Sequence, residues 1–277
     1  MKKISRRSFM AAAAVSVAAL ALTACGGSAS SAASSVASSA ASSTAASSGA
    51  AALSTVVAGK LTMATNATFP PYEMTTDSGE IEGIDVDTAK AIAEKLGLEL
   101  QIDDMDFDAA LLSVQQGKAD IVMAGVTVTD ERKAVMDFSD SYATGIQSII
   151  VPSDSDIASP DDLAGKKIGT QRGTTGYIYC SDDFGEDSVV AYDNGLTAVQ
   201  ALNNGQVDAV VIDNAPATEY VAANPGLKVL DTSYAEEDYA IGMAKGSALE
   251  DAVNKALEEL KADGTLQAIV DKYINAN

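Results

Sequence analysis

From about residue 56 onwards, apolar positions alternate between two spacings, that of β-strands and that of helices. Short apolar runs predict strands at 60–65, 98–102 and 121–124. Helical spacing recurs at Ala89, Ile92, Ala93 and Leu96, with Gly97 as a helix stop, and again over about 109–116. Strands that alternate with helices are typical of α/β architecture, in which helices pack against largely parallel sheets.

A single arginine follows the strand predicted at 121–124. That strand stops at Gly125, where backbone can approach a ligand closely. Arg132 then lies in the first turn of a helix that should begin near Thr129. The donors of a guanidinium match a carboxylate, and together with backbone N–H groups they form a receptor for one small anion. Arg132 is therefore a candidate anion-binding residue.

The same layout recurs 88 residues later in the chain. When Gly117 is aligned with Gly205, both segments read as a helix end, a glycine, two residues, an aspartate and an apolar strand. This connection is common in α/β proteins, but the shared Gly-x-x-Asp favours equivalent units in two similar domains. The alignment pairs Gly125 with Asp213, and ligands gather at such carboxyl ends of strands. Arg132 and Asp213 could then hold opposite ends of one ligand, although Asp213 could equally cap the next helix.

Two further loops supply candidate binding residues. The loop after the first strand carries Phe69 beside two prolines that stiffen it, so this ring can form one wall of a cleft. The segment 168–176 contains glycines and threonines that can present N–H groups and hydroxyls to a ligand. Because the GxxxxGK[ST] pattern of phosphate loops is absent, a carboxylate or another small polar group is the expected ligand. Arg172 in this segment is either a second ligand-facing cation or an ordinary surface residue.

Composition narrows the classes of function. The 277-residue chain is 47% hydrophobic, carries a formal net charge of -21 and contains no histidine. Strong acidity argues against nucleic acid as a partner. The lack of histidine removes the commonest metal ligand and His-dependent nucleophilic catalysis. We therefore expect no metal, no cofactor and no catalytic residue. We expect Cys180 to be a buried or half-buried structural thiol and not a reactive one.

The first 55 residues predict export and tethering. Residues 1–24 have the basic start and short apolar stretch of a signal peptide. An LTAC tetrad ending at Cys25 resembles the lipobox of bacterial lipoproteins, which implies cleavage before Cys25, lipidation of its thiol and attachment to the membrane. Residues 25–55 are rich in Ser and Ala and should form a flexible linker. Paired Arg6 and Arg7 leave the twin-arginine and general export routes both open.

Several motifs together resemble the extracytoplasmic solute-binding proteins (family 3) of polar amino-acid ABC importers. The resemblance covers about 57–274 and rests on the Phe107 region and on GIDVD at 83–87, GVTVTDER at 125–132, DFS at 137–139, GTT at 173–175 and VDAVVID at 207–213. It implies a periplasmic-binding-protein-like fold of type II, two α/β lobes joined by two crossover strands. Lobe 1 would comprise 56–142 and 237–277, and lobe 2 would comprise 143–236.

The resemblance also implies which residues hold the two charged ends of an amino acid. Arg132 would bind the α-carboxylate, assisted by backbone N–H groups at Thr127 and at Thr174 or Thr175. Asp213 would receive the α-ammonium.

Further roles follow from the same resemblance. The carbonyl oxygen of Gly125 would assist at the ammonium, and Phe69 and Phe107 would flank the ligand. Asn66 and Gln171 would read the side chain. Since both readers are neutral amides, we expect a neutral polar side chain or tolerance of several.

The implied function is capture of a polar amino acid outside the cytoplasmic membrane by a lipid-anchored monomer, which delivers it to an ABC permease through hinged closure of its lobes. Two alternatives stay open. One is a cyclohexadienyl (arogenate or prephenate) dehydratase-like enzyme on the same fold, which would need an acid in the cleft, where Asn66 stands instead. The other is a ligand-sensing module for a membrane signalling partner.

Overall fold

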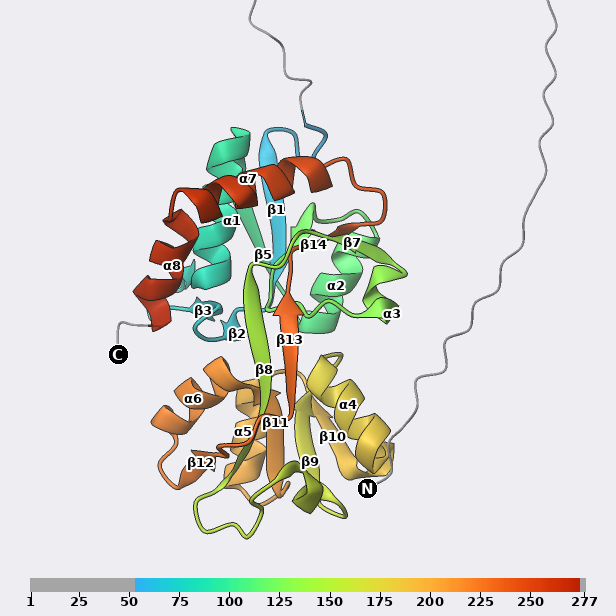
Figure 1. The fold of residues 1–277 in the computed structure, drawn as a ribbon, viewed down its shortest axis with the longest axis vertical. Coiled ribbons are helices and arrows are strands. Elements are labelled where there is room, and N and C mark those ends of the chain that lie inside the picture. Colours follow the sequence, from blue (N-terminus) through green and yellow to red (C-terminus); the bar gives the residue numbers. More distant parts are fainter. Residues whose placement is uncertain (1–52, 275–277) are drawn as a thin grey trace, which may run out of the picture. The chain divides into compact units, whose positions relative to one another are not determined.

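A computed structural model describes residues 53–274, which belong to one compact unit. These residues form two α/β lobes, each built on its own sheet, and two crossover strands join them (Figure 1). The predicted signal peptide, Cys25 and most of the predicted linker lie outside the described residues.

Lobe 1 contains a five-stranded sheet in the order β5-β1-β6-β14-β7. Its strands are β1 (Lys60–Thr65), β5 (Glu99–Asp104), β6 (Ile121–Val122), β7 (Met136–Phe138) and β14 (Gly242–Ala244). A small second sheet comprises β2 (Thr68–Phe69), β3 (Glu73–Thr75) and β4 (Ile81–Glu82). The helices are α1 (Ile84–Leu96), α2 (Phe107–Gln115), α3 (Asp130–Lys133), α7 (Glu250–Ala262) and α8 (Thr265–Ile274). Since β1 runs parallel to β5 and β6, their carboxyl ends meet at one edge.

Lobe 2 repeats this plan in the sheet order β10-β9-β11-β8-β12. Its strands are β8 (Ala143–Pro152), β9 (Ile168–Gln171), β10 (Val189–Tyr192), β11 (Ala209–Asp213) and β12 (Leu227–Val229). The helices are α4 (Thr175–Phe184), α5 (Gly195–Asn203) and α6 (Asn214–Ala223), with short 3-10 turns at Pro160–Leu163 and Glu186–Ser188. Parallel pairing of β9 with β10 and β11 again brings the strand ends together.

Strands β8 and β13 (Ala235–Tyr239) connect the two lobes (Figure 1). They pair antiparallel, with Gln147 opposite Ala235 and Ala143 opposite Tyr239. Gly145 of β8 leaves room for the Tyr239 ring, because a Cβ at this position would lie 2.4 Å from the ring. The crossover pair therefore fixes where the Tyr239 side chain points.

Glycine explains why the helix ends were predictable. Helix α1 stops at Leu96 because Gly97 adopts a left-handed conformation (φ 69°) and its N–H bonds to a carbonyl of the last turn. The predicted strand at 121–124 was too long, since β6 pairs only over Ile121–Val122. Met123 and Ala124 are buried, but they already lead into the turn at Gly125 (φ 56°).

The repeated segment has the same geometry in both lobes. Gly117 (φ 65°) ends α2 and Gly205 (φ 67°) ends α5, and both N–H groups bond to the carbonyl three residues earlier at 3.0 Å. The aspartates that follow have matching contacts. Asp120 accepts from the N–H of Thr62, and Asp208 accepts from that of Lys167, each at 2.8 Å. The predicted equivalence of the two helix–strand units is confirmed.

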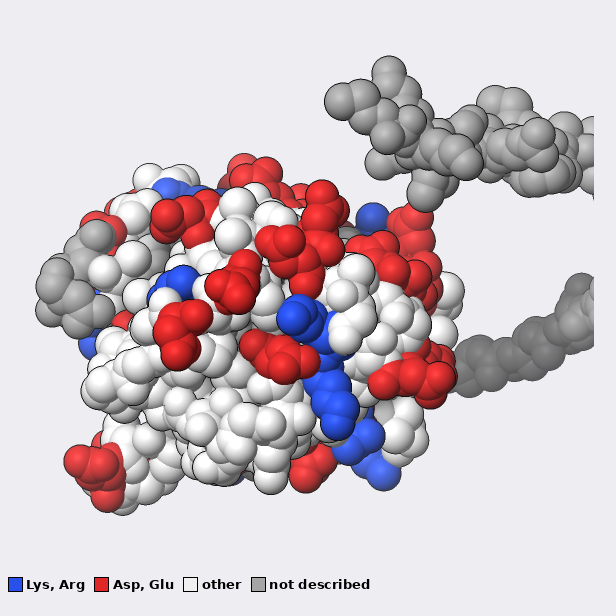
Figure 2. Space-filling view, turned by 90° about the horizontal axis from the view of Figure 1, so that it is seen from below, with Lys and Arg blue, Asp and Glu red and all other residues white. Residues whose placement is uncertain are grey.

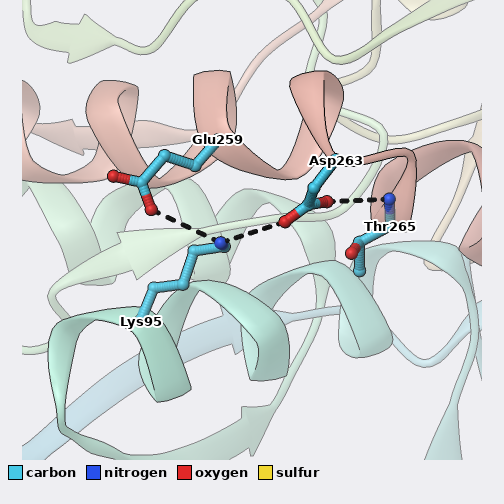
Figure 3. A network of polar contacts seen from close by, with 4 residues as sticks. All are labelled: Lys95, Glu259, Asp263 and Thr265. Atoms are coloured by element: carbon cyan, nitrogen blue, oxygen red, sulfur yellow. Dashed lines mark hydrogen bonds and ion pairs between the residues drawn. The ribbon is translucent and has the colours of Figure 1, made fainter.

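Surface charges also join distant parts of lobe 1. Lys95 at the end of α1 contacts Glu259 at 3.4 Å and Asp263 at 3.2 Å, and Asp263 accepts from the N–H of Thr265 at the start of α8 (Figure 3). Figure 2 shows acidic side chains spread over the face seen from below, with a narrow band of Lys and Arg among them. Within residues 53–274, no helix is long and apolar enough to cross a membrane.

Candidate functional site

All ten predicted ligand-binding residues line one cavity, at which strand ends of the two lobes meet. The space between its lining atoms, counted together with solvent open to the outside, is about 310 Å³. Its lining consists of Asn66, Phe69, Phe107, Gly125, Thr127, Arg132, Gln171, Thr174, Thr175 and Asp213, together with Glu73 and Ala124. The two ends of the repeated segment are therefore brought together in space.

Arg132 is a buried cation held by neutral groups. Thr129 caps α3 by accepting from the Arg132 N–H at 3.2 Å, which places the side chain over the cavity. The guanidinium donates to the carbonyl oxygens of Thr127 at 2.8 Å and Gly173 at 3.1 Å, and lies 5.4 Å from the centre of the Phe107 ring. The side chain makes no ion pair within 4.0 Å among the described residues. Burial lowers its pKa, as expected for a desolvated cation.

Asp213 ends β11 and faces the same cavity. Although it occupies the N-cap position of α6, its side chain makes no capping hydrogen bond, so the capping alternative is wrong. Instead the carboxylate accepts from Gln147 Nε2 at 2.8 Å and from the hydroxyl of Tyr239. Burial, followed by the nearby negative charge of Glu237, raises the pKa of Asp213 to about 7.

The start of α4 adds backbone donors near Arg132. Thr174 is the N-cap, and its hydroxyl oxygen accepts from the N–H of Tyr177 at 3.3 Å. The first N–H groups of a helix have no carbonyl of an earlier turn to bond, and the helix dipole makes this end positive. Together with Arg132, the α4 N-terminus gives this end of the cavity the donors and positive potential that suit an anion.

Two amides meet at another part of the cavity. Gln171 Nε2 donates to Asn66 Oδ1 at 2.9 Å, which links the end of β9 in lobe 2 to the end of β1 in lobe 1. Asn66 also donates to the carbonyl of Met105 at 2.9 Å. Phe69 and Phe107 are nearly fully buried in the lining. This part of the cavity is neutral and polar, with an aromatic wall.

Several residues in the cavity lining or bonded to it were not predicted from the sequence. Three of them lie on the crossover strands: Gln147, Glu237 and Tyr239. The alternation of polar and apolar residues along a strand does not show which of its faces is covered by a neighbouring lobe. Glu73 lines the cavity from β3 and is fully buried. Burial, with the charge of nearby Asp85, raises the Glu73 pKa well above its ordinary range. The one feature of the sequence that could have indicated Glu73 as a site residue was its position directly after the rigid proline loop.

Two residues left open by the sequence lie away from the cavity lining. Arg172 is exposed and pairs with Asp193 at 3.4 Å, so the surface alternative holds. Cys180 is buried, and burial raises the pKa of its thiol to about 12, as expected for a structural cysteine. Within the described part of the chain, no group of three or more potential ligands could hold a metal ion.

The fold and this cavity define a class: a two-lobed binding protein of the periplasmic-binding-protein-like type II architecture. The chain belongs to the bacterial extracellular solute-binding proteins, family 3, whose model matches residues 61–276. These are solute-binding proteins and not enzymes, so the enzyme alternative falls away.

Relatives and solved structures agree with this assignment. A probable histidine-binding protein of Neisseria gonorrhoeae is 35% identical, covering 95% of this chain and 94% of the relative. The arginine-, lysine-, histidine-binding protein ArtJ of Geobacillus stearothermophilus has a TM-score of 0.75 and 35% identity, covering 79% of this chain and 96% of that chain. An ancestral arginine-binding protein bound to arginine has a TM-score of 0.74 and 44% identity, covering 78% of this chain and 98% of that chain.

Proposed function

We propose that this protein binds a polar amino acid outside the cytoplasmic membrane and delivers it to an ABC transporter permease. The observation that carries the proposal is a buried Arg132 without a carboxylate partner among the described residues, in the same cavity as the buried Asp213. An uncompensated buried charge is costly. An amino acid brings one charge of each sign and would offset both.

The proposed pose uses each group according to its chemistry. The α-carboxylate lies against Arg132 and the N–H groups of Thr127 and of Thr174 or Thr175. The α-ammonium lies against Asp213 and the carbonyl oxygen of Gly125.

The side chain then extends between the two phenylalanines. Phe69 and Phe107 flank it, and the amides of Asn66 and Gln171 read its polar end. The two proteins described above from Neisseria gonorrhoeae and Geobacillus stearothermophilus are named for histidine and for arginine, lysine and histidine, so these are the first ligands to test, with glutamine as the neutral comparison.

Closure would follow from contacts with both lobes. We assign 56–142 and 237–277 to lobe 1 and 143–236 to lobe 2. Arg132 and Asp213 then belong to different lobes, so a ligand that contacts both binds the closed arrangement more tightly and shifts the equilibrium towards it.

Isothermal titration calorimetry with each amino acid tests the proposal. Arg132→Ala should weaken the tightest ligand by roughly tenfold to a hundredfold, because hydrogen bonds between charged groups contribute about 1.5–3 kcal/mol. Arg172→Ala is the matched control, since it removes an exposed arginine from the neighbouring loop. Binding of no amino acid by the wild-type protein would refute the proposal, and undiminished affinity in Arg132→Ala would remove this residue from the site.

We further propose that residues 1–24 are removed, that Cys25 is lipidated and that residues 25–55 tether the binding unit as a monomer. The lipobox-like tetrad directly after an apolar stretch supports the first two points. Metabolic labelling with a fatty acid should mark the wild-type protein and not Cys25→Ser. Equal labelling of both would contradict the assignment.

A further inference from the structure

Glu237 collects hydrogen bonds from three different segments of the chain. It lies on crossover strand β13 and is only 6% exposed. Its Oε2 accepts from the hydroxyl of Thr127 at 3.1 Å, from that of Thr175 at 3.0 Å and from Gln147 Nε2 at 3.0 Å. Thr127 belongs to lobe 1, Thr175 begins α4 of lobe 2, and Gln147 lies on the other crossover strand. One buried carboxylate thus joins both lobes and both crossover strands.

These contacts decide where the two hydroxyl hydrogens point. A threonine hydroxyl has a single hydrogen to donate and two lone pairs to accept with. The Thr127 and Thr175 oxygens lie 3.5 Å from each other, but a carboxylate is a better acceptor than a hydroxyl, so both hydrogens are directed to Glu237. Both threonines line the cavity, whereas Glu237 is not part of its lining. Neither hydroxyl therefore has a hydrogen left for a ligand carboxylate, and both can only accept from a ligand.

Gln147 carries the influence of Glu237 to Asp213. Its Nε2 donates to Glu237 at 3.0 Å and to Asp213 at 2.8 Å, so one amide group bridges the two carboxylates. The negative charge of Glu237 also acts on the two ends of the site, because it favours the charged form of Arg132 and raises the pKa of Asp213. A raised pKa favours the protonated form of Asp213, so the acceptors that Glu237 supplies to this network are its own carboxylate and the two hydroxyl oxygens that it orients.

We infer that Glu237 is a positioning residue that makes the cavity select ligands carrying an α-ammonium group. It does so by turning the hydroxyls of Thr127 and Thr175 into acceptors and by holding Gln147 against Asp213. The inference rests on the proposed function, because it concerns how the same cavity distinguishes an amino acid from a carboxylic acid that lacks the amine.

The test compares two ligands on the full chain. One is the tightest-binding amino acid of the calorimetric panel, and the other is the same molecule with hydrogen in place of the α-ammonium, which for L-arginine is δ-guanidinovaleric acid. Glu237→Leu removes the acceptor, Glu237→Gln keeps a carbonyl oxygen in its place, and Glu236→Leu changes the exposed neighbour on the same strand. Thermal melting establishes that each variant folds.

Opposite responses of the two ligands are expected. Glu237→Leu should weaken the amino acid by at least about tenfold, because the ammonium loses oriented acceptors. It should leave the deaminated acid unchanged or bound more tightly, because Arg132 is no longer opposed by a neighbouring negative charge. Glu237→Gln should stay within about threefold of the wild type for both ligands, and Glu236→Leu should change neither, since charges near the surface contribute little.

Several results would overturn the inference. Equal weakening of both ligands by Glu237→Leu would indicate general packing, and an unchanged amino-acid affinity would indicate no role. If Glu237→Leu does not fold, Thr127→Val and Thr175→Val each remove one acceptor and should weaken the amino acid more than the deaminated acid; equal effects would again refute it. A wild-type protein that binds no amino acid would refute the proposed function, and this inference with it.

Discussion

At the scale of single residues, the site is defined by charges that the fold buries without neutralising. Arg132 is held by carbonyl oxygens and an aromatic ring, and Asp213 by an amide and a phenol. Neutral partners satisfy the hydrogen bonds of a charged group but leave its charge. These two residues therefore cost stability until an opposite charge arrives, which is the arrangement expected of a binding site.

A pH dependence of binding follows from Asp213, whose pKa is raised to about 7. An ammonium group binds the ionised carboxylate, so binding lowers this pKa and releases a proton. Affinity for L-arginine should therefore rise by about tenfold for each unit of pH up to pH 7 and level off above it. Calorimetry between pH 5.5 and 8.5, about 1.5 units on either side of that pKa, measures this slope.

Asp213→Asn provides the comparison for this experiment. Asp85, with a pKa of about 6, accepts from the N–H of Gly125 and titrates in the lower part of the same window. The variant should bind more weakly and lose the part of the pH dependence centred near pH 7. A flat wild-type profile across the window would contradict the role of Asp213 as the ammonium partner.

At the scale of elements, the repeated helix end provides two glycines in matching conformations and surroundings. Gly117 and Gly205 have nearly the same positive φ, 65° and 67°, and a Cβ added at either position would meet no other atom within 4 Å. The substitutions Gly117→Ala and Gly205→Ala should therefore each cost about 1 kcal/mol, from backbone strain alone. Urea unfolding measures both, and costs that differ by several-fold would contradict equal geometry.

Gly83→Ala tests the opposite case. A Cβ there would lie 2.1 Å from the carbonyl oxygen of Tyr72, so the start of α1 would have to move. We expect a loss of more than about 2 kcal/mol, well above that of the two helix-end glycines. A loss as small as theirs would show that α1 can shift without cost.

Particular residues show how far the sequence could predict these elements. The helix ends at Gly97 and Gly117 were predictable, because glycine readily adopts the left-handed conformation that ends a helix. The strand at 121–124 was predicted too long, because apolar composition reports burial and not the point where strand pairing stops.

For the site, strand-end residues were predictable from local pattern and family motifs. Glu237 was not, because its role depends on two lobes that only the folded chain brings together.

At the scale of the whole molecule, buried acids make stability depend on pH. The pKa values of Asp85 and Asp213 are raised to about 6 and about 7, so the folded protein holds these protons more tightly than the unfolded chain. Their contribution to stability is fully present below about pH 4 and is lost as pH rises through 6 to 7. The high net negative charge acts in the same direction.

The melting temperature of the protein without added ligand should accordingly fall between pH 5 and pH 7.5, as the free energy of unfolding drops by on the order of 2–4 kcal/mol. A saturating amino acid should reduce this fall, because its ammonium stabilises the ionised Asp213. Differential scanning calorimetry with and without ligand measures both effects. A melting temperature that rises over this range would contradict the buried-acid explanation.

The proposed pose, with three groups of the ligand held in one cavity, has a geometric consequence. Arg132, Asp213 and the bonded pair of Asn66 and Gln171 occupy different parts of its lining. With the carboxylate and the ammonium fixed at the first two, exchanging one enantiomer for the other swaps the hydrogen and the side chain on Cα. A D-amino acid would then direct its side chain away from the two amides. The cavity therefore distinguishes L- from D-amino acids. Although the two lobes are similar, this distinction arises because different side chains stand at the ends of their strands.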